Sequence, residues 1–228
     1  QAEDEVIVRL ESSGGMVHAY GLAAAQLARI KEAGLNLTVC IDKVAASGGY
    51  MMACVADKIL AAPFAVVGSI GVVAQVPNFH DLLEKHDIDV EVFTAGKYKR
   101  TVTVFGENTE EDKQKFQQEL EETHKLFKDF VHKYRPSLDV EQVATGEHWY
   151  GEDAITRNLV DALQTSDSYI LEKMTNSELY AIQSRQKPTI AQKLGISQAA
   201  QAVVATAIDK LPDALAKLQS AKMPMVKK

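Results

Sequence analysis

The stretch LTVCIDKVAASGGYMMACVADKILA, residues 37–61, decides the fold class of this chain. Its first run, Leu37–Ile41, is short, apolar and rich in β-branched residues, which predicts a buried strand, and Asp57–Ala61 predicts another. Between them, Ala45–Gly49 predicts a turn, and the residues that follow to Val55 predict a helix. Strand, turn, helix and strand in this order are typical of a βαβ unit, so the sequence predicts an α/β fold with a parallel sheet.

The residues before this stretch predict the same kind of unit once more. Glu5–Leu10 is another β-branched run, Ser12–Gly15 is a tight turn, and Val17–Ala33 is a helix that ends at Gly34. Farther along, Thr109 and Asp112 resemble a capping box, which opens a long amphipathic helix. The other predicted elements are, in chain order, a loop over Pro63 and Gly68–Gly71, a short helix at Leu82–His86, a strand at Val90–Phe93, the end of the long helix near Tyr134, a turn at Trp149–Gly151, a helix at Asp153–Asn158 with Asn158 in a left-handed cap, a strand at Leu159–Leu163 and an Ala-rich helical region at Ala199–Ala221.

The composition excludes several classes of protein. The chain has 228 residues and a formal net charge of −6, and its basic residues are scattered among acids, which argues against nucleic-acid binding. Its two cysteines, Cys40 and Cys54, lie in apolar runs and are interpreted as small buried side chains, with a disulfide left open. The six histidines are dispersed, so we predict no metal site and no cofactor. The chain opens without an initiator Met and enters a strand almost at once, so we expect a fragment of a larger protein.

Ser47 is the first candidate catalytic residue. It stands at a predicted strand-to-helix turn and is followed by Gly48 and Gly49, which remove side-chain bulk where a substrate would approach. The N–H that follows the serine, at a helix N-terminus, is placed to bind an oxyanion. The alternative interpretation is an ordinary helix N-cap serine beside a glycine turn.

Two more segments complete a possible active site. The backbone of Gly14, in the turn after the first strand, could donate the second hydrogen bond to an oxyanion, although a Gly-Gly turn is often only structural. Lys99 could be a general base if burial without a carboxylate partner kept it neutral, because the reference lysine pKa of about 10.4 leaves the amine charged at pH 7. The alternative is an exposed lysine in a basic loop. His18, His80 and His86 lack an orienting acid, so a His-based triad competes poorly.

Taken together, these segments resemble the signal peptide peptidase A (protease IV) family of Ser-Lys serine peptidases. The resemblance runs from about Val6 to Leu163 and rests on a combination of motifs: LESSGGMVHAYG (residues 10–21), IDKVAASGGYMMACVADKI (41–59), VGSIGVV (67–73), TAGKYKRT (94–101), GENTEED (106–112) and GEHWYGEDAITRNLVDAL (146–163).

The resemblance implies a role for five residues. Ser47 would be the nucleophile, and Lys99, 52 residues later, would be the base in preference to Lys97. Ser69 would orient the lysine amine, and the N–H groups of Gly14 and Gly48 would form the oxyanion hole.

The resemblance also implies a fold and a setting. The fold would be crotonase-like (ClpP-like), with stacked ββα units in a peptidase core at 1–165 whose opening strands are absent, and with a mostly helical extension at 166–228 for oligomerisation or as a mobile tail. We expect peptide substrates such as signal peptides or membrane-protein fragments, and assembly into a homo-oligomeric ring. A membrane anchor outside this chain would hold the domain in the bacterial periplasm at the inner membrane, and the chain itself would be soluble.

Two departures from the family pattern accompany the resemblance. Ser13 stands where the family usually has proline, so the turn loses a preset φ near −65° and some rigidity. Asn158 replaces a usual glycine, which left-handed geometry permits.

Two other functions stay open: a non-catalytic ring scaffold that binds peptides, and a crotonase-type acyl-CoA enzyme, which would give Lys99 no role.

Overall fold

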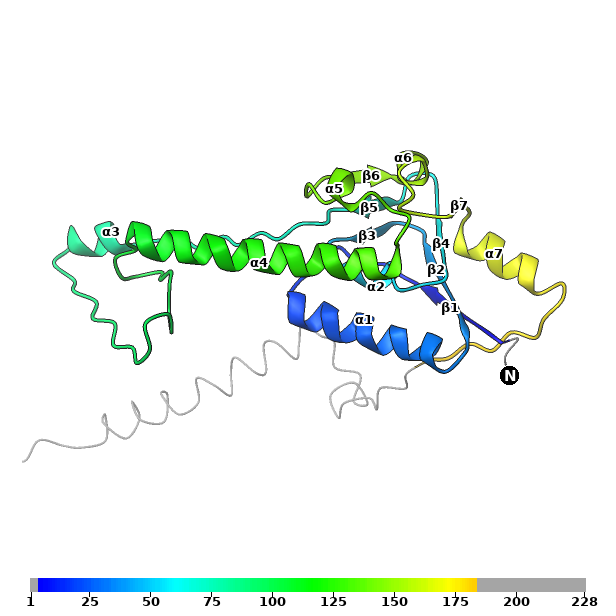
Figure 1. Ribbon diagram of the computed structural model, residues 1–228, viewed down its shortest axis with the longest axis horizontal. Helices are drawn as coiled ribbons and strands as arrows, with labels where there is room; N and C mark the ends of the chain where they lie inside the picture. The colour runs from blue at the N-terminus through cyan, green and yellow to red at the C-terminus, as the bar shows by residue number, and fades with distance from the viewer. Residues whose placement is uncertain (1–3, 184–228) are drawn as a thin grey trace, which may run out of the picture. The chain divides into compact units, whose positions relative to one another are not determined.

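The structure is a computed structural model that describes residues 4–183 (Figure 1). All of its helices and strands in that range belong to one compact unit, Gln1–Ser177. The predicted helical region at 199–221 lies outside the described residues. The elements are, in chain order, β1 (Glu5–Arg9), α1 (Val17–Glu32), β2 (Asn36–Ile41), β3 (Val44–Ala46), α2 (Gly48–Ala53), β4 (Lys58–Ala61), β5 (Val66–Gly68), α3 (His80–Glu84), α4 (Glu110–Tyr134), α5 (Val140–Val143), β6 (His148–Tyr150), α6 (Gly151–Thr156), β7 (Ala162–Leu163) and α7 (Ser166–Lys173).

A parallel sheet of four strands confirms the α/β prediction. Its strand order is β1-β2-β4-β7, and every neighbouring pair is parallel. Val39 of β2 lies opposite Val8 of β1 and Ile59 of β4. Helix α1 connects β1 to β2, and α2 lies between β2 and β4, as the βαβ pattern predicted.

The two faces of this sheet carry different helices because side chains alternate along each strand. On one face, Val39 and Ile41 of β2 join the main core with α1, α2 and the C-terminal half of α4. On the other face, Cys40 and Leu60 pack against Tyr169 of α7. The sheet is therefore a layer between helices on both sides, and its β2 strand is almost fully buried.

A second sheet of three short strands was not predicted. Its order is β3-β5-β6, with β3 parallel to β5 and β5 antiparallel to β6. The sequence predicted loops or turns in all three places. In contrast, the predicted strand at Val90–Phe93 is wrong: the structure has no strand there, and these residues are exposed because no neighbouring strand pairs with them.

The long helix α4 begins at its predicted capping box. The Thr109 hydroxyl accepts a hydrogen bond from Asp112 N–H, and the Asp112 carboxylate accepts one from Thr109 N–H, so two orphan donors of the first turn are satisfied. Phe127 and Val131, in its C-terminal half, are buried in the main core. Figure 1 shows that its N-terminal half extends beyond the sheets, toward α3.

A buried ion pair anchors the end of α4 to the parallel sheet. Both terminal nitrogens of Arg135 donate to the Asp161 carboxylate, at 3.0 and 2.7 Å, and Ile59 N–H of β4 donates to the same carboxylate. Asn158, whose carbonyl also accepts from Arg135, has φ 60°, which confirms the left-handed cap predicted for it. Tyr50 of α2 donates to the Leu159 carbonyl beside this pair, so α2 is held at the same point.

Helix α7 follows the predicted domain boundary at residue 165, and that division stays a prediction. The helix packs on the sheet. Its Tyr169 donates a hydrogen bond to Glu5 of β1, and its Lys173 forms an ion pair with the same carboxylate. Thr38 of β2 donates to the same carboxylate. Among residues 4–183, no helix combines the length and the apolar character needed to cross a membrane.

Candidate active site

Ser47 occupies a strained turn between β3 and α2. Its backbone has φ 52° and ψ −122°, a conformation that residues other than glycine rarely adopt and that costs about 1–3 kcal/mol. Two hydrogen bonds fix the turn: Ser47 N–H donates to the Gly68 carbonyl at 2.8 Å, and Met51 N–H donates to the Ser47 carbonyl at 3.0 Å. The fold therefore maintains an unfavourable backbone conformation at this serine.

The hydroxyl of Ser47 does not cap the helix that it precedes. Ser47 is the N-cap residue of α2, but within residues 4–183 its side chain makes no capping hydrogen bond. The side chain is half-buried and at the edge of the core. The alternative of an ordinary capping serine is therefore not what the structure shows, and the hydroxyl is left available for another partner.

The turn of Gly14 packs directly against Ser47. Gly14 has φ +94°, and a Cβ placed on it would lie 2.8 Å from Ser47 Cβ and 2.7 Å from Gly48 N, so no side chain fits between the two turns. The Gly48 N–H begins α2 and has no partner inside that helix. The structure thus brings the two predicted oxyanion donors and the predicted nucleophile together. The Gly14 N–H itself donates to Ser12 Oγ at 3.2 Å.

Tyr20 and Ser12 contact this cluster and were missed by sequence reasoning. The Tyr20 ring lies over Gly48 and Gly15, and its hydroxyl forms a 2.7 Å hydrogen bond with Ser12 Oγ. The available signal was the position of Tyr20 in the first turn of the predicted helix, directly after the glycine turn. A partly buried tyrosine there needs a polar partner for its hydroxyl.

Ser69 lies beside Ser47 through the pairing of β3 with β5. Ala46 and Gly68 are partners in the parallel register, and each serine directly follows one of them, so both leave the same end of the sheet. Ser69 is half-buried, and its φ is also 52°. Its N–H donates to the Glu147 carbonyl at 2.6 Å.

Lys99 is placed differently from the other predicted site residues. It is exposed, in the segment between α3 and α4, whereas the sequence argument required a buried amine. The neighbouring residues of this segment contact the first turns of α4: Lys97 pairs with Glu111 at 2.9 Å, and Lys115 lies over the Tyr98 ring.

The same contacts place Lys99 away from Ser47. From Glu111 to Phe127, which reaches the core, α4 rises by about 24 Å at 1.5 Å per residue. Figure 1 shows the segment between α3 and α4 beside the N-terminal end of α4, away from β3 and α2. The chain on its own therefore unites Ser47, Ser69, Gly14 and Gly48 but not Lys99. The physical reason is that this segment packs on α4 instead of on the sheets.

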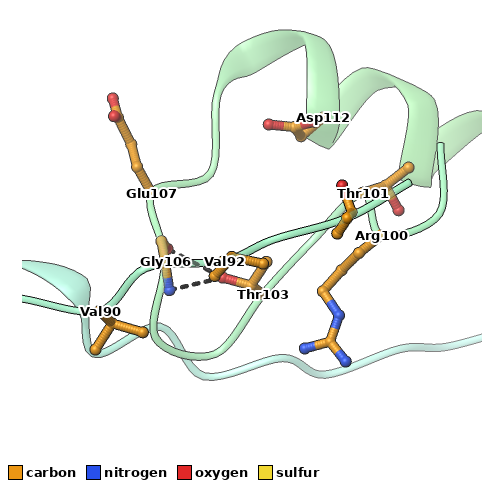
Figure 2. Close-up of a pocket in the computed structure, with 9 residues that line it drawn as sticks. Val90, Val92, Arg100, Thr101, Thr103, Gly106, Glu107 and Asp112 are labelled. Carbon is orange, nitrogen blue, oxygen red and sulfur yellow. Dashed lines mark hydrogen bonds between the residues drawn. The ribbon is translucent and has the colours of Figure 1, made fainter. Parts of the chain in front are cut away.

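A polar hollow of about 280 Å³ lies in the Lys99 segment (Figure 2). Hydrogen bonds between Thr103 and Gly106 close the loop that borders it, and the Asn78 side chain donates to the carbonyls of both residues. Of the predicted site residues, none lines this hollow. Its lining comprises Val90, Val92, Thr94, Arg100, Thr101, Thr103, Gly106, Glu107 and Asp112.

Neither cysteine offers a competing nucleophile. Both are free and buried, which agrees with the sequence interpretation. Burial raises the pKa of the Cys40 thiol to about 11 and that of Cys54 to about 12, so the reactive thiolate is disfavoured at neutral pH.

One group of side chains in the described part of the chain has the composition of a metal site. His80, Asp81 and Glu84 of α3 can bring one ligand atom each within 4.8 Å of one another. Their carboxylates are exposed, and Figure 1 shows α3 beside the N-terminal end of α4, away from β3 and α2. The group therefore adds nothing to the chemistry at Ser47.

Comparison with known proteins identifies the family. The model of peptidase family S49 matches residues 29–180, and the model of the N-terminal part of that family matches residues 1–27. The probable protease SohB of Haemophilus influenzae is 65% identical over 195 residues, which are 86% of this chain and 55% of the relative. The probable protease SohB of Buchnera aphidicola subsp. Schlechtendalia chinensis is 59% identical over 170 residues, 75% of this chain and 56% of the relative.

A more distant relative supports the same assignment. The putative protease MJ0651 of Methanocaldococcus jannaschii is 33% identical over 179 residues, 75% of this chain and 56% of the relative. The chain spans about half the length of these relatives. The chain therefore belongs to peptidase family S49, in the group of proteins that includes SohB.

Proposed function

We propose that this chain carries the nucleophile of a serine endopeptidase that works by a Ser-Lys dyad. The observation that supports it most is the geometry at Ser47: a strained backbone, a hydroxyl that does not cap α2, and the Gly14 backbone packed against the Gly48 N–H. A nucleophilic serine needs a hydroxyl that is not committed to the fold and backbone N–H donors beside it.

The proposed reaction proceeds through an acyl-enzyme. Neutral Lys99 Nζ takes the proton of Ser47 Oγ, and the oxygen attacks the carbonyl carbon of the scissile peptide bond. The N–H groups of Gly48 and Gly14 stabilise the oxyanion, and the Gly14 N–H is then shared between the oxyanion and Ser12 Oγ, to which it donates at 3.2 Å. The lysine then gives its proton to the leaving amine, and it later activates the water that hydrolyses the ester. Ser69 orients the amine.

Lys99 reaches Ser47 only if its segment is brought over the turn. Three events could do this: assembly with another copy of the chain, contact with a part of the protein outside this chain, or closure around a peptide. Assembly into a homo-oligomeric ring is the one that we favour, because the segment is exposed and rich in apolar side chains such as Val92, Phe93 and Phe105.

The remaining parts of the proposal follow from the resemblance to the family. The parallel sheet with helices on both faces is compatible with a crotonase-like (ClpP-like) fold of stacked ββα units. The substrates would be signal peptides or membrane-protein fragments. The full-length protein would reach them from an inner-membrane anchor with its peptidase domain in the periplasm.

The proposal is tested by hydrolysis of an unfolded peptide. Ser47→Ala and Lys99→Ala should each reduce the rate by at least about 10³-fold, because either loss removes a member of the dyad. Lys97→Ala is the matched control, since it removes a lysine two residues away that pairs with Glu111, and it should leave the rate within about twofold. Full activity of the Ser47 or the Lys99 variant would refute the dyad.

A non-catalytic scaffold that binds peptides is the second candidate function. The observation that favours it is the exposure of Lys99, which the described residues do not bring to Ser47 as its base. On this hypothesis, Ser47→Ala binds an unfolded peptide as tightly as the unchanged protein does, and neither cleaves it in the assembled state. Cleavage that depends on Ser47 would reject the scaffold.

A further inference from the structure

One tyrosine packs on both of the glycine turns that meet at Ser47. A Cβ placed on Gly48 would lie 2.4 Å from Tyr20 Cγ, and one placed on Gly15 would lie 2.9 Å from Tyr20 Cε2. The ring of Tyr20 therefore lies directly on the backbone of both glycine turns. Glycine is required at both places because any side chain would displace the ring.

The hydroxyl of Tyr20 is linked to the Gly14 N–H through Ser12. Ser12 Oγ is 2.7 Å from the Tyr20 hydroxyl, and it accepts the Gly14 N–H at 3.2 Å. Ser12 is itself fixed, because its N–H donates to the Val44 carbonyl and its carbonyl accepts from Ala46 N–H. A connected path thus runs from the strand that leads into Ser47, through Ser12, to the Gly14 N–H and Tyr20.

We propose that Tyr20 is a positioning residue that holds the Gly14 and Gly48 turns in the geometry of an oxyanion hole, with Ser12 as its intermediary. The inference rests on the proposed function. The turn needs such a restraint because Ser13, Gly14 and Gly15 are free of any ring constraint, and two adjacent glycines leave the peptide planes easy to rotate. An N–H donor that is not held in place must be oriented during the reaction, so it stabilises the transition state less. Loss of the restraint therefore lowers kcat and leaves KM nearly unchanged.

Removal of the hydroxyl alone separates positioning from folding. Tyr20→Phe keeps the ring over the glycines, and we expect kcat to fall about tenfold while KM stays within twofold. The matched control is Tyr169→Phe, which loses one hydroxyl bonded to Glu5 on the opposite face of the sheet and should leave both constants unchanged. An unchanged kcat in Tyr20→Phe, or an equal loss of kcat in Tyr169→Phe, would overturn the inference.

A double-mutant cycle tests the restraint itself. Within the described residues, Ser13 N–H donates no hydrogen bond, and Ser12 pairs in an extended bridge with Ala45, so proline fits at position 13. Ser13→Pro would fix φ near −65°, and in that background Tyr20→Phe should lower kcat less than threefold. Effects that simply multiply would show that Tyr20 does not restrain this turn.

Hydrogen exchange of the Gly14 amide gives a readout that does not need hydrolysis. Tyr20→Phe and Ser12→Ala should each speed its exchange about tenfold, while the Val39 amide in β2 exchanges as before. Unchanged Gly14 exchange would reject the role of Tyr20 even if the chain is an active peptidase. Faster Gly14 exchange together with full activity of Ser47→Ala would instead reject the proposed function and confirm that Tyr20 orders the turn.

Discussion

The turn of Ser47 and the segment of Lys99 are built in opposite ways. Ser47 lies between β3 and α2. The Gly14 turn packs against it, and the Gly68 carbonyl at the end of β5 accepts its N–H. Lys99 is exposed and lies between α3 and α4, in a segment whose Lys97 pairs with Glu111 at the beginning of α4. The chain therefore brings together the proposed nucleophile and the proposed oxyanion donors, but it leaves the proposed base, Lys99, exposed. On the proposed mechanism, a complete dyad then requires assembly with another copy, contact with a part of the protein outside this chain, or closure around a peptide.

Among the changes that test this contrast, the largest effect is expected from a substitution in the glycine turn that packs against Ser47. Gly14→Ala would place a Cβ 2.7 Å from Gly48 N and force a side chain into φ +94°, so the two turns must separate. We expect peptide hydrolysis to fall about 10²–10³-fold, the usual consequence of losing one oxyanion donor. Steady-state kinetics on an unfolded peptide measures it.

Gly21→Ala is the matched control for this change. Gly21 lies in α1, and nothing is within 4 Å of the place that its Cβ would take. The variant should retain activity and gain up to about 1 kcal/mol of stability from helix propensity. Equal activity of the Gly14 and Gly21 variants would show that the close contact of the two turns has no catalytic meaning.

The next effect concerns stability of the core behind Ser47. Arg135→Ala leaves the Asp161 carboxylate without its ion-pair partner, and we expect the free energy of unfolding to fall by about 3 kcal/mol. The value is at the low end for a buried pair because a third of the Asp161 side chain is exposed. Urea denaturation measures the loss, and a loss below about 1 kcal/mol would contradict the anchoring role of this pair.

The third prediction concerns pH and the attachment of α7. Burial by itself would raise the pKa of Glu5, but hydrogen bonds from Lys173, Thr38 and Tyr169 outweigh it and lower the pKa overall. A lowered pKa adds stability that is complete above about pH 5 and is lost as the pH falls through the folded-state pKa. Glu5→Gln should therefore reduce the free energy of unfolding by about 2 kcal/mol at pH 7 and weaken its acid dependence.

Denaturation from pH 7 to pH 3 provides the measurement for Glu5. The control is Glu141→Gln, whose side chain is 78% exposed and pairs with Lys128 at the surface. That variant should change the free energy of unfolding by less than about 1 kcal/mol. An unaltered acid dependence in Glu5→Gln would assign the pH sensitivity to Asp42 or Asp57, whose pKa values are also lowered against the effect of burial.

The smallest effect belongs to the Lys99 segment. Lys97→Ala breaks an ion pair whose two side chains are 68% and 69% exposed, so the melting temperature should stay close to that of the unchanged protein. Thermal unfolding of the two proteins side by side measures this. A loss as large as that of Arg135→Ala would mean that the segment is part of the cooperative core and would weaken the contrast between the two regions.

Local signals in the sequence were sufficient for much of the fold. The capping box of Thr109 and Asp112 predicted the start of α4, and the apolar, β-branched run Leu37–Ile41 predicted a buried strand. Both signals depend only on neighbours in the chain. The strands β3, β5 and β6 were missed because each has three residues and exists only through pairing with distant segments. Val90–Phe93 was predicted as a strand from its apolar residues alone, but no segment among the described residues pairs with it.

The candidate site divides along the same line. Ser47, Gly14 and Gly48 could be predicted as candidate site residues because their glycine turns follow predicted strands. The structure joins the two turns through the parallel bridge between Ser12 and Ala45. Tyr20 was missed because its contact with Gly48 crosses between α1 and α2, a relation that spacing does not encode. The burial of Lys99 was expected from chemical need alone, and no local pattern in its segment supplies that burial.

The reactivity of the Ser47 hydroxyl tests the account most directly. A fluorophosphonate probe should form a covalent adduct on Ser47 in the assembled protein, identified by peptide mass spectrometry, and Lys99→Ala should slow its formation at least about 10²-fold. Absence of an adduct on Ser47, or an adduct that forms equally fast without Lys99, would contradict it.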